Sequence, residues 1–132
     1  MHLIVCLEEN NGLSFCGRRL SSDREATSHI LKMTAGSKLR MNPYSAALFP
    51  DREILVDEDF LEKAGEGDYC FLENTPVPDQ FRNLESVIVY RWNRRYPSTV
   101  KFPVEILTGR EVVETVEFYG YSHENITMQR YR

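Results

Sequence analysis

The apolar run at the start of the chain constrains its fold more than any other feature. Residues 3–7 (Leu-Ile-Val-Cys-Leu) are all apolar, which predicts a strand buried on both faces, as in a parallel sheet. Residues 8–12 follow with Asn and Gly, which favour a turn. A helix start comes soon afterwards. In open α/β sheets, ligands bind where a central strand gives way to a loop and a helix, so we expect a site at this edge.

The helix predicted after this loop has start and stop signals. Ser22 is the expected N-cap, because Glu25 three residues later completes a capping-box pattern. Asp23 adds negative charge at the positive end of the helix dipole. Gly36 is placed to end the helix in the left-handed conformation. The apolar stripe that would pack on the sheet consists of Ala26, Ile30, Leu31 and Met33.

Shorter elements are predicted along the rest of the chain. Asn42 is the expected cap of a second helix with Pro43 at its first position, and Asp57 the expected cap of a helix over residues 58–64. Residues 122–132 fit either a helix capped by Ser122 or a last strand. The expected strands are residues 38–41, 54–56, 69–72, 85–93 and 111–119. This order predicts an α/β fold, with a mixed, mostly parallel central sheet flanked by helices.

Length and charge narrow the class of protein. A chain of 132 residues fits a single domain over residues 1–132 with one hydrophobic core. The net charge of -4 gives no overall attraction to nucleic acid or anionic lipid. No run approaches the roughly 18 apolar residues needed to cross a membrane, and no signal peptide is visible. We therefore expect a cytoplasmic protein with no membrane partner. Its cysteines, Cys6, Cys16 and Cys70, are expected to be reduced, buried thiols, with a metal or redox site as the alternative.

Several kinds of catalytic site can be weighed on residue types and spacing. The three histidines (His2, His29 and His123) are isolated, so we expect no zinc centre or other metal site. Neither a P-loop nor a Gly-x-Gly-x-x-Gly run is present. His123 beside Glu124 is either a general acid or base, or a surface or capping residue. A Ser-His-Asp triad is compatible with the composition, although there is no Gly-x-Ser-x-Gly elbow. We assign no catalytic residue from the sequence.

Four stretches along the chain match the pattern of a known family. They are residues 5–12, residues 33–41, residues 87–93 with the later Phe102-Pro103, and Ser122-His123 near a basic end. In this order they resemble the dihydrofolate reductase family. They correspond there to the opening strand with its Asn-Gly active-site loop, a helix end with the second strand, a late strand, and the last hairpin. The resemblance implies a dihydrofolate reductase-like fold.

Three departures from that family pattern concern its chemistry. The family's acidic proton-relay residue falls on Ala26, and Glu25 lies one place off, about 100° around the helix. Asn42-Pro43 replaces the Gly-Arg that opens the family's cofactor-binding helix. Residues 72–74 replace the paired glycines beside the cofactor, where a carboxylate would repel pyrophosphate. The resemblance therefore implies a reductase-like scaffold without reductase activity, for which no cofactor is expected.

A pair of arginines just before the first helix is the leading candidate for a binding site. Helix N-termini hold anions, and Arg18 and Arg19 could add bidentate contacts. Alternatively, these arginines pair with Asp23, Glu25 or Glu8. We expect a small anionic ligand or a protein partner at the edge formed by the loop over residues 10–23 and the turn over residues 42–45. The predicted site residues are Asn11, Gly12, Arg18, Arg19, Ser22, Asn42, Tyr44 and Ser45.

A second basic cluster, residues 91–96 (Arg-Trp-Asn-Arg-Arg-Tyr), mixes arginines with aromatics as single-strand nucleic-acid binders do. Alternatively, it is a strand end with inward aromatics and solvated or paired arginines, and the net charge favours this interpretation. Two alternatives to a ligand-binding domain thus stay open. One is a pyridine-nucleotide-dependent reductase that uses NADPH with relocated acid chemistry. The other is a single-stranded nucleic-acid binder acting through Arg91 to Tyr96.

Overall fold

The parallel half of the sheet is built around the apolar run at the start of the chain. The computed structural model describes residues 1–49, 53–81 and 83–132. β1 (His2–Leu7) lies between β6 (Tyr69–Phe71) and β7 (Ser86–Arg91) and runs parallel to both. β4 (Leu39–Met41) and β5 (Leu55–Val56) continue the parallel arrangement beyond β6. The leucines, Ile4 and Val5 of β1 are fully buried, which confirms the predicted burial of this strand on both faces.

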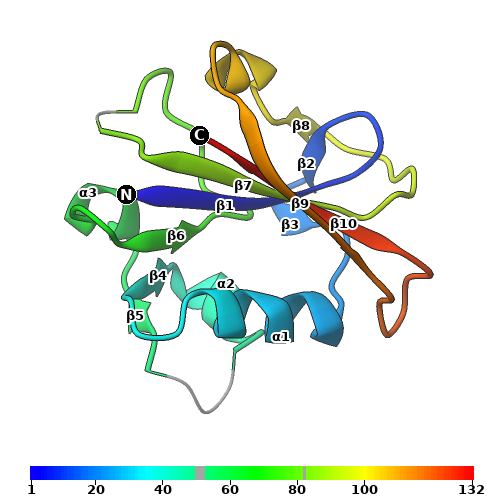
Figure 1. The fold of residues 1–132 in the computed structure, drawn as a ribbon, viewed down its shortest axis with the longest axis horizontal. Coiled ribbons are helices and arrows are strands. Elements are labelled where there is room, and N and C mark those ends of the chain that lie inside the picture. Colours follow the sequence, from blue (N-terminus) through cyan, green and yellow to red (C-terminus); the bar gives the residue numbers. More distant parts are fainter. Residues whose placement is uncertain (50–52, 82) are drawn as a thin grey trace.

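The other half of the sheet is antiparallel. β10 (Ile126–Tyr131) pairs with β7 and with β9 (Val112–Phe118), completing seven strands in the order β5-β4-β6-β1-β7-β10-β9 (Figure 1). The sheet is therefore mixed and mostly parallel, as predicted. Residues 122–132 were expected to form either a helix or a last strand, and β10 shows that they contain the strand. Ser122 caps no helix there; its backbone N–H donates to Asp23, at 2.8 Å.

A second, three-stranded antiparallel sheet lies outside the expectations from sequence. β2 (Gly12–Phe15) pairs with β3 (Arg18–Arg19) on one side and with β8 (Val100–Lys101) on the other. Cys16 and Gly17 connect β2 to β3 with positive φ angles of 49° and 77°, the backbone conformation typical of tight hairpins. The predicted loop over residues 10–23 is thus partly a hairpin. Its partner β8 lies more than 80 residues away, beyond the reach of local sequence patterns.

Two helices lie on one face of the large sheet, at the bottom of Figure 1. α1 (Arg24–Met33) is capped by Asp23, which accepts the Glu25 N–H at 2.8 Å. Ser22 is exposed and is not the cap, because the stronger carboxylate acceptor one residue later takes that place. α2 (Pro43–Ala46) has the predicted cap, since Asn42 accepts the Ser45 N–H at 3.0 Å.

The remaining helical turns are short. α3 (Phe60–Lys63) starts later than predicted, with Asp59 as its N-cap. Asp57 precedes the helix and accepts the Asp59 N–H at 2.9 Å, so its carboxylate forms a turn before the helix rather than the cap itself. A 3-10 turn, η1 (Val104–Leu107), follows Pro103. No helix in the described part of the chain is long and apolar enough to cross a membrane.

Apolar side chains pack on both faces of the large sheet. On the helix side, Ile30 of α1 packs in one cluster with Ile4, and on the other side Phe60 packs with Leu3 and Val5. β1 supplies both clusters because alternate side chains of a strand point to opposite faces. This burial fixes the position of the carboxyl end of β1, where the chain enters the predicted site.

Candidate functional site

An ion pair lies at the predicted edge of the sheet. Arg19 of β3 contacts Glu73, which follows β6, through two hydrogen bonds: Nε to Oε2 at 2.9 Å and Nη2 to Oε1 at 3.1 Å. Ser45 donates its hydroxyl to Glu73 Oε1 at 2.7 Å. The Arg19 guanidinium also lies 4.3 Å from the centre of the Tyr44 ring and donates to the Tyr44 carbonyl at 3.2 Å. We call these four residues the Arg19 cluster.

The two charged side chains of the Arg19 cluster are mostly buried, and their charges offset each other. The side chain of Arg19 is 23% exposed and that of Glu73 only 6%. Burial alone would lower the pKa of Arg19, but the hydrogen bond and charge of Glu73 outweigh it and raise the pKa. The guanidinium therefore stays charged and its charge is offset by Glu73. The partner of Arg19 is none of the three acidic residues expected from the sequence.

The structure brings only some of the predicted site residues together. Arg19, Tyr44 and Ser45 share the Arg19 cluster. Asn42 lies beside it and donates to Asn74 Oδ1 at 2.9 Å and to Thr75 Oγ1 at 3.2 Å. From the sequence, Glu73 is expected only to repel the pyrophosphate of a cofactor. Its role as a partner depends on a contact between residues 54 positions apart.

Asn11, Gly12 and Ser22 lie outside this group. The Gly12 N–H donates to the buried Glu8 carboxylate at 2.6 Å. A Cβ at Gly12 would lie 2.5 Å from Ser98 Oγ, so glycine is required there for close packing. Asn11 occupies a turn with φ 64°, and the Ser22 carbonyl accepts the Ser122 hydroxyl at 3.3 Å. These contacts give Asn11, Gly12 and Ser22 structural roles in the loops.

A surface cavity of about 530 Å³ adjoins the Arg19 cluster. Arg18 is exposed at its wall. The other side chains combine apolar and aromatic surface with a thiol, so the cavity offers positive charge next to apolar walls. Its lining residues are Phe15, Cys16, Arg18, Arg19, Leu20, Tyr96 and Pro97.

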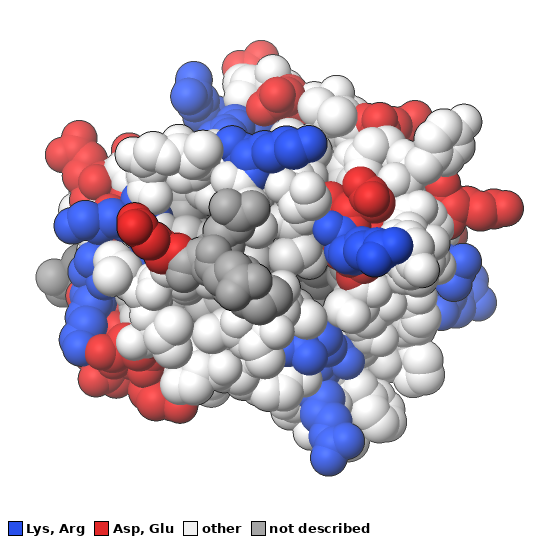
Figure 2. Space-filling model, turned by 90° about the horizontal axis from the view of Figure 1, so that it is seen from below, with Lys and Arg blue, Asp and Glu red and all other residues white. Residues whose placement is uncertain are grey.

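The basic stretch over residues 91–96 turns its aromatics inward. Trp92 is 3% exposed and stacks on the ring of His123, with centroids 4.5 Å apart. Arg91 donates to Gln129 at 2.8 Å and to the Tyr131 hydroxyl at 3.0 Å. Figure 2 shows acidic and basic side chains interspersed on the face that carries α1 and α2, with no single-sign stripe among the residues coloured there. The buried Trp92 and the paired Arg91 match the strand-end interpretation of the stretch.

His123 is buried, not at the surface, and contacts a carboxylate at the start of α1. Its Nδ1 lies 2.9 Å from Asp23 Oδ2, whereas Glu124 is exposed. Burial alone would raise the pKa of Asp23, but hydrogen bonds from the Tyr121 backbone and the His123 side chain outweigh it, lowering the pKa well below its usual range. Asp23 is therefore an ionised carboxylate beside His123. Sequence reasoning missed this pair because the two residues are 100 positions apart.

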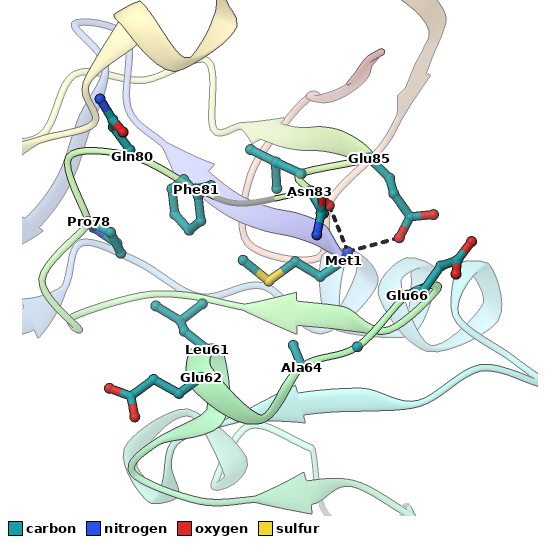
Figure 3. Close-up of a pocket in the computed structure, with 12 residues that line it drawn as sticks. Met1, Leu61, Glu62, Ala64, Glu66, Pro78, Gln80, Phe81, Asn83 and Glu85 are labelled. Atoms are coloured by element: carbon teal, nitrogen blue, oxygen red, sulfur yellow. Dashed lines mark hydrogen bonds and ion pairs between the residues drawn. The ribbon is translucent and has the colours of Figure 1, made fainter.

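Another cavity lies at the opposite edge of the sheet, at the amino ends of β1 and β7 (Figure 3). It has a volume of about 1010 Å³ and is lined by Leu61, Phe81 and several acidic residues. The Met1 amino group, drawn beside it in Figure 3, is paired with Glu85 at 2.8 Å. Its acidic rim does not suit an anion. Among the residues that the structure describes, no three His, Cys, Asp or Glu side chains form a cluster that could hold a metal ion.

Comparison with known proteins defines the fold. No protein-family model and no curated protein sequence matches the chain. Among solved structures, a dihydrofolate reductase from Enterococcus faecalis, complexed with NADP(H) and RAB-propyl, matches with a TM-score of 0.67. The match covers 99% of this chain and 94% of the reductase at 13% sequence identity. The chain therefore has a dihydrofolate reductase-like fold, as the resemblance predicted, and the low identity leaves function to be argued from the site.

Proposed function

We propose that this chain is a cytoplasmic ligand-binding domain of dihydrofolate reductase-like fold that lacks reductase activity. In this proposal it binds a small anionic ligand in the cavity beside Arg18. The observation that carries the proposal is the cavity of about 530 Å³ lined by the exposed Arg18, at the edge where a ligand site is expected. The three cysteines are free thiols, which supports a reducing compartment. Cys70 is buried and Cys6 half-buried, but Cys16 is exposed, because it lies in the turn between β2 and β3.

The residues at this edge do not fit a dinucleotide cofactor. A pyrophosphate there would meet the Glu73 carboxylate, which is already held by Arg19 and Ser45. The N-terminus of α2 offers little to an anion, since Pro43 has no N–H and the Ser45 N–H is bonded to Asn42. Ala26, at the position of the family's acidic residue, is buried and carries no proton to transfer. These contacts support the absence of reductase chemistry.

The cavity beside Arg18 suits an anionic group attached to a small apolar body. Its volume of about 530 Å³ lies within the usual range for small-molecule sites. Because Glu73 offsets the charge of Arg19, the exposed guanidinium of Arg18 is the group expected to contact the anion. Phe15 and Pro97 would cover the apolar part of the ligand.

Thermal-shift measurements with a ligand panel test this proposal. The panel contains inorganic phosphate, aromatic carboxylates, nucleotides, folates, NADPH and a short single-stranded oligonucleotide. A ligand at about 100 times its Kd stabilises the fold by roughly 2.7 kcal/mol, which is a shift of several degrees. We expect a shift with an anionic compound that is lost in Arg18→Ala. It should persist in Arg132→Ala, which removes an exposed arginine at the other edge of the sheet.

Other results of these measurements would contradict the proposed site or support one of the two alternative functions. A full shift in Arg18→Ala would overturn the site. A shift with NADPH, accompanied by oxidation of the cofactor in the presence of dihydrofolate, would establish the reductase instead. Oligonucleotide binding that weakens steeply with salt would support the nucleic-acid binder acting through residues 91–96.

A further inference from the structure

Three polar side chains converge between the N-terminus of α1 and the turn that connects β9 to β10. Ser21 and Asp23 come from the segment between β3 and α1, and His123 comes from the turn. The Ser21 hydroxyl oxygen lies 3.0 Å from His123 Nε2, and Asp23 Oδ2 lies 2.9 Å from His123 Nδ1. A hydroxyl, an imidazole and a carboxylate therefore follow one another at hydrogen-bond distance. This is the order found in serine hydrolases.

The surroundings hold the imidazole in one orientation. The side chains of Asp23 and His123 are 0% and 2% exposed. The indole of Trp92 stacks on the imidazole with an angle of 20° between the planes. An ionised carboxylate can only accept, so in the neutral imidazole Nδ1 carries the proton. Its Nε2 then presents a lone pair to the Ser21 and Tyr96 hydroxyls, which lie 3.0 Å and 3.1 Å away.

The Ser21 hydroxyl contacts His123 and, more distantly, Tyr96. Among the described residues, its oxygen lies 3.0 Å from His123 Nε2, to which it can donate, and accepts from the Tyr96 hydroxyl at 3.5 Å. Asp23, in contrast, also holds the turn, because it accepts the N–H groups of Tyr121 and Ser122. Anchoring of the turn therefore explains why a carboxylate occupies position 23. It does not explain why the Ser21 hydroxyl faces His123.

Ser21 lies next to the cavity beside Arg18. It is half-buried, and its chain neighbour Leu20 and its hydrogen-bond partner Tyr96 both line the cavity beside Arg18. On its other side, His123 lines a second cavity of about 830 Å³ that also includes Arg94 and Tyr121. A small substrate could approach the hydroxyl while Asp23 stays shielded from water.

We propose that Ser21, His123 and Asp23 form a nucleophilic triad that hydrolyses small carboxylic esters, an activity beyond the ligand binding proposed above. The Ser21 oxygen attacks the ester carbonyl carbon while His123 Nε2 takes the hydroxyl proton. When the bond to the leaving alkoxide breaks, the same proton passes to the alkoxide and an alcohol departs. Water then attacks the acyl-serine while His123 takes one of its protons. When the acyl bond breaks, this proton passes to the Ser21 oxygen, which restores the hydroxyl and releases the carboxylic acid. Asp23 stabilises the imidazolium at both stages.

Covalent labelling with a fluorophosphonate probe tests the nucleophile directly. We expect intact-mass measurement to show one adduct per chain and peptide mapping to place it on Ser21. Ser21→Ala should give no adduct, while circular dichroism shows the wild-type fold, because the Asp23–His123 pair remains. Ser37→Ala is the matched control. It removes an exposed serine beyond the other end of α1 and should label as the wild type does.

Hydrolysis of p-nitrophenyl acetate gives a second, independent measurement. The wild-type rate should exceed that of Ser21→Ala, and Asp23→Asn should lower kcat by on the order of 100-fold or more. A purely structural cluster would give no adduct on Ser21 in folded wild-type protein, and that result would overturn the proposal. Labelling or hydrolysis that is unchanged in Ser21→Ala would overturn it as well.

Discussion

Two buried carboxylates, Asp23 and Glu73, organise their surroundings at the level of single residues. Glu73 joins β3 to α2 through Arg19 and Ser45. Asp23 joins the first turn of α1 to the turn before β10. Carboxylates with this little exposure are tolerated only when hydrogen bonds and opposite charge compensate for lost hydration. Substitutions at these residues should therefore affect stability strongly.

The contribution of Asp23 to stability should depend on pH. Its pKa in the folded state is lowered from the ordinary value of 3.8. A depressed pKa means that the stabilisation is complete above the ordinary value and is lost as the pH falls below about 4 toward the folded-state pKa. We expect the free energy of unfolding of the wild type to fall in this range. Asp23→Asn should be less stable at neutral pH and should show a smaller fall.

Urea unfolding at pH 7, 4 and 3 checks this expectation. A wild type and an Asp23→Asn variant that lose the same free energy between pH 7 and pH 3 would contradict it. Glu8 also has a lowered pKa, since hydrogen bonds from Asn10 and Gly12 N–H groups outweigh the effect of burial. The comparison with Asp23→Asn separates the Asp23 contribution from this background.

Arg19→Ala should destabilise the protein by about 2–3 kcal/mol. The change leaves the Glu73 carboxylate, 6% exposed, without its charged partner. Arg18→Ala is the matched control, since Arg18 is exposed and its loss should change stability by about 0.5 kcal/mol or less. Urea unfolding measures both. Equal, small effects of the two substitutions would show that the ion pair contributes nothing to the fold.

At the level of elements, the connection between β9 and β10 is held against α1 by close backbone packing at Gly120. A Cβ at this residue would lie 2.7 Å from Asp23 Oδ2 and 2.7 Å from the His123 carbonyl oxygen. The second of these atoms belongs to the backbone and cannot move aside without moving the turn. Glycine is therefore required where the turn meets the helix N-terminus.

Gly120→Ala should lower the free energy of unfolding by about 1–3 kcal/mol through overpacking. It should also lower the labelling of Ser21, because the turn carries His123. Gly65→Ala is the control: the nearest atom to its Cβ would be 3.9 Å away, and its φ is not in the left-handed region. Urea unfolding of both variants compares them. A Gly120→Ala protein as stable as Gly65→Ala would show that the turn adjusts freely.

At the level of the whole molecule, one continuous sheet runs from β5 to β9 with apolar clusters on both faces. The first and last parts of the chain meet within it, because β1 pairs with β7 and β7 pairs with β10. Removal of a central strand such as β1 or β7 would expose the strands on both of its sides. This arrangement favours unfolding as one cooperative unit.

The single tryptophan makes this prediction measurable. Trp92 is buried at the end of β7, so its fluorescence reports on packing near the helices, whereas far-ultraviolet circular dichroism reports on the sheet as a whole. We expect the two signals to change together in one urea transition. Two separate transitions would contradict the single domain predicted over residues 1–132.

Local patterns in the sequence were enough to predict much of the fold. The apolar residues of β1, the Asn42-Pro43 start of α2 and the order of strands all follow rules that act within a few residues. The N-cap of α1 is Asp23, one residue after the predicted Ser22. Both residue types are good N-caps, and only the contact with the turn near residue 121 favours the carboxylate. The family resemblance supplied the remaining topology.

The site depended on contacts that no local pattern contains. Arg19 and Glu73 are 54 residues apart, and Ser21 and His123 are 102 residues apart. Whether Arg19 is a free cation or a neutralised one, and whether Ser21 faces a histidine or water, is decided by which strands become neighbours. Sequence determines the local conformation because turns, caps and apolar spacing act over short distances. Tertiary structure alone determines the chemistry here, because burial and charge pairing depend on where distant segments meet.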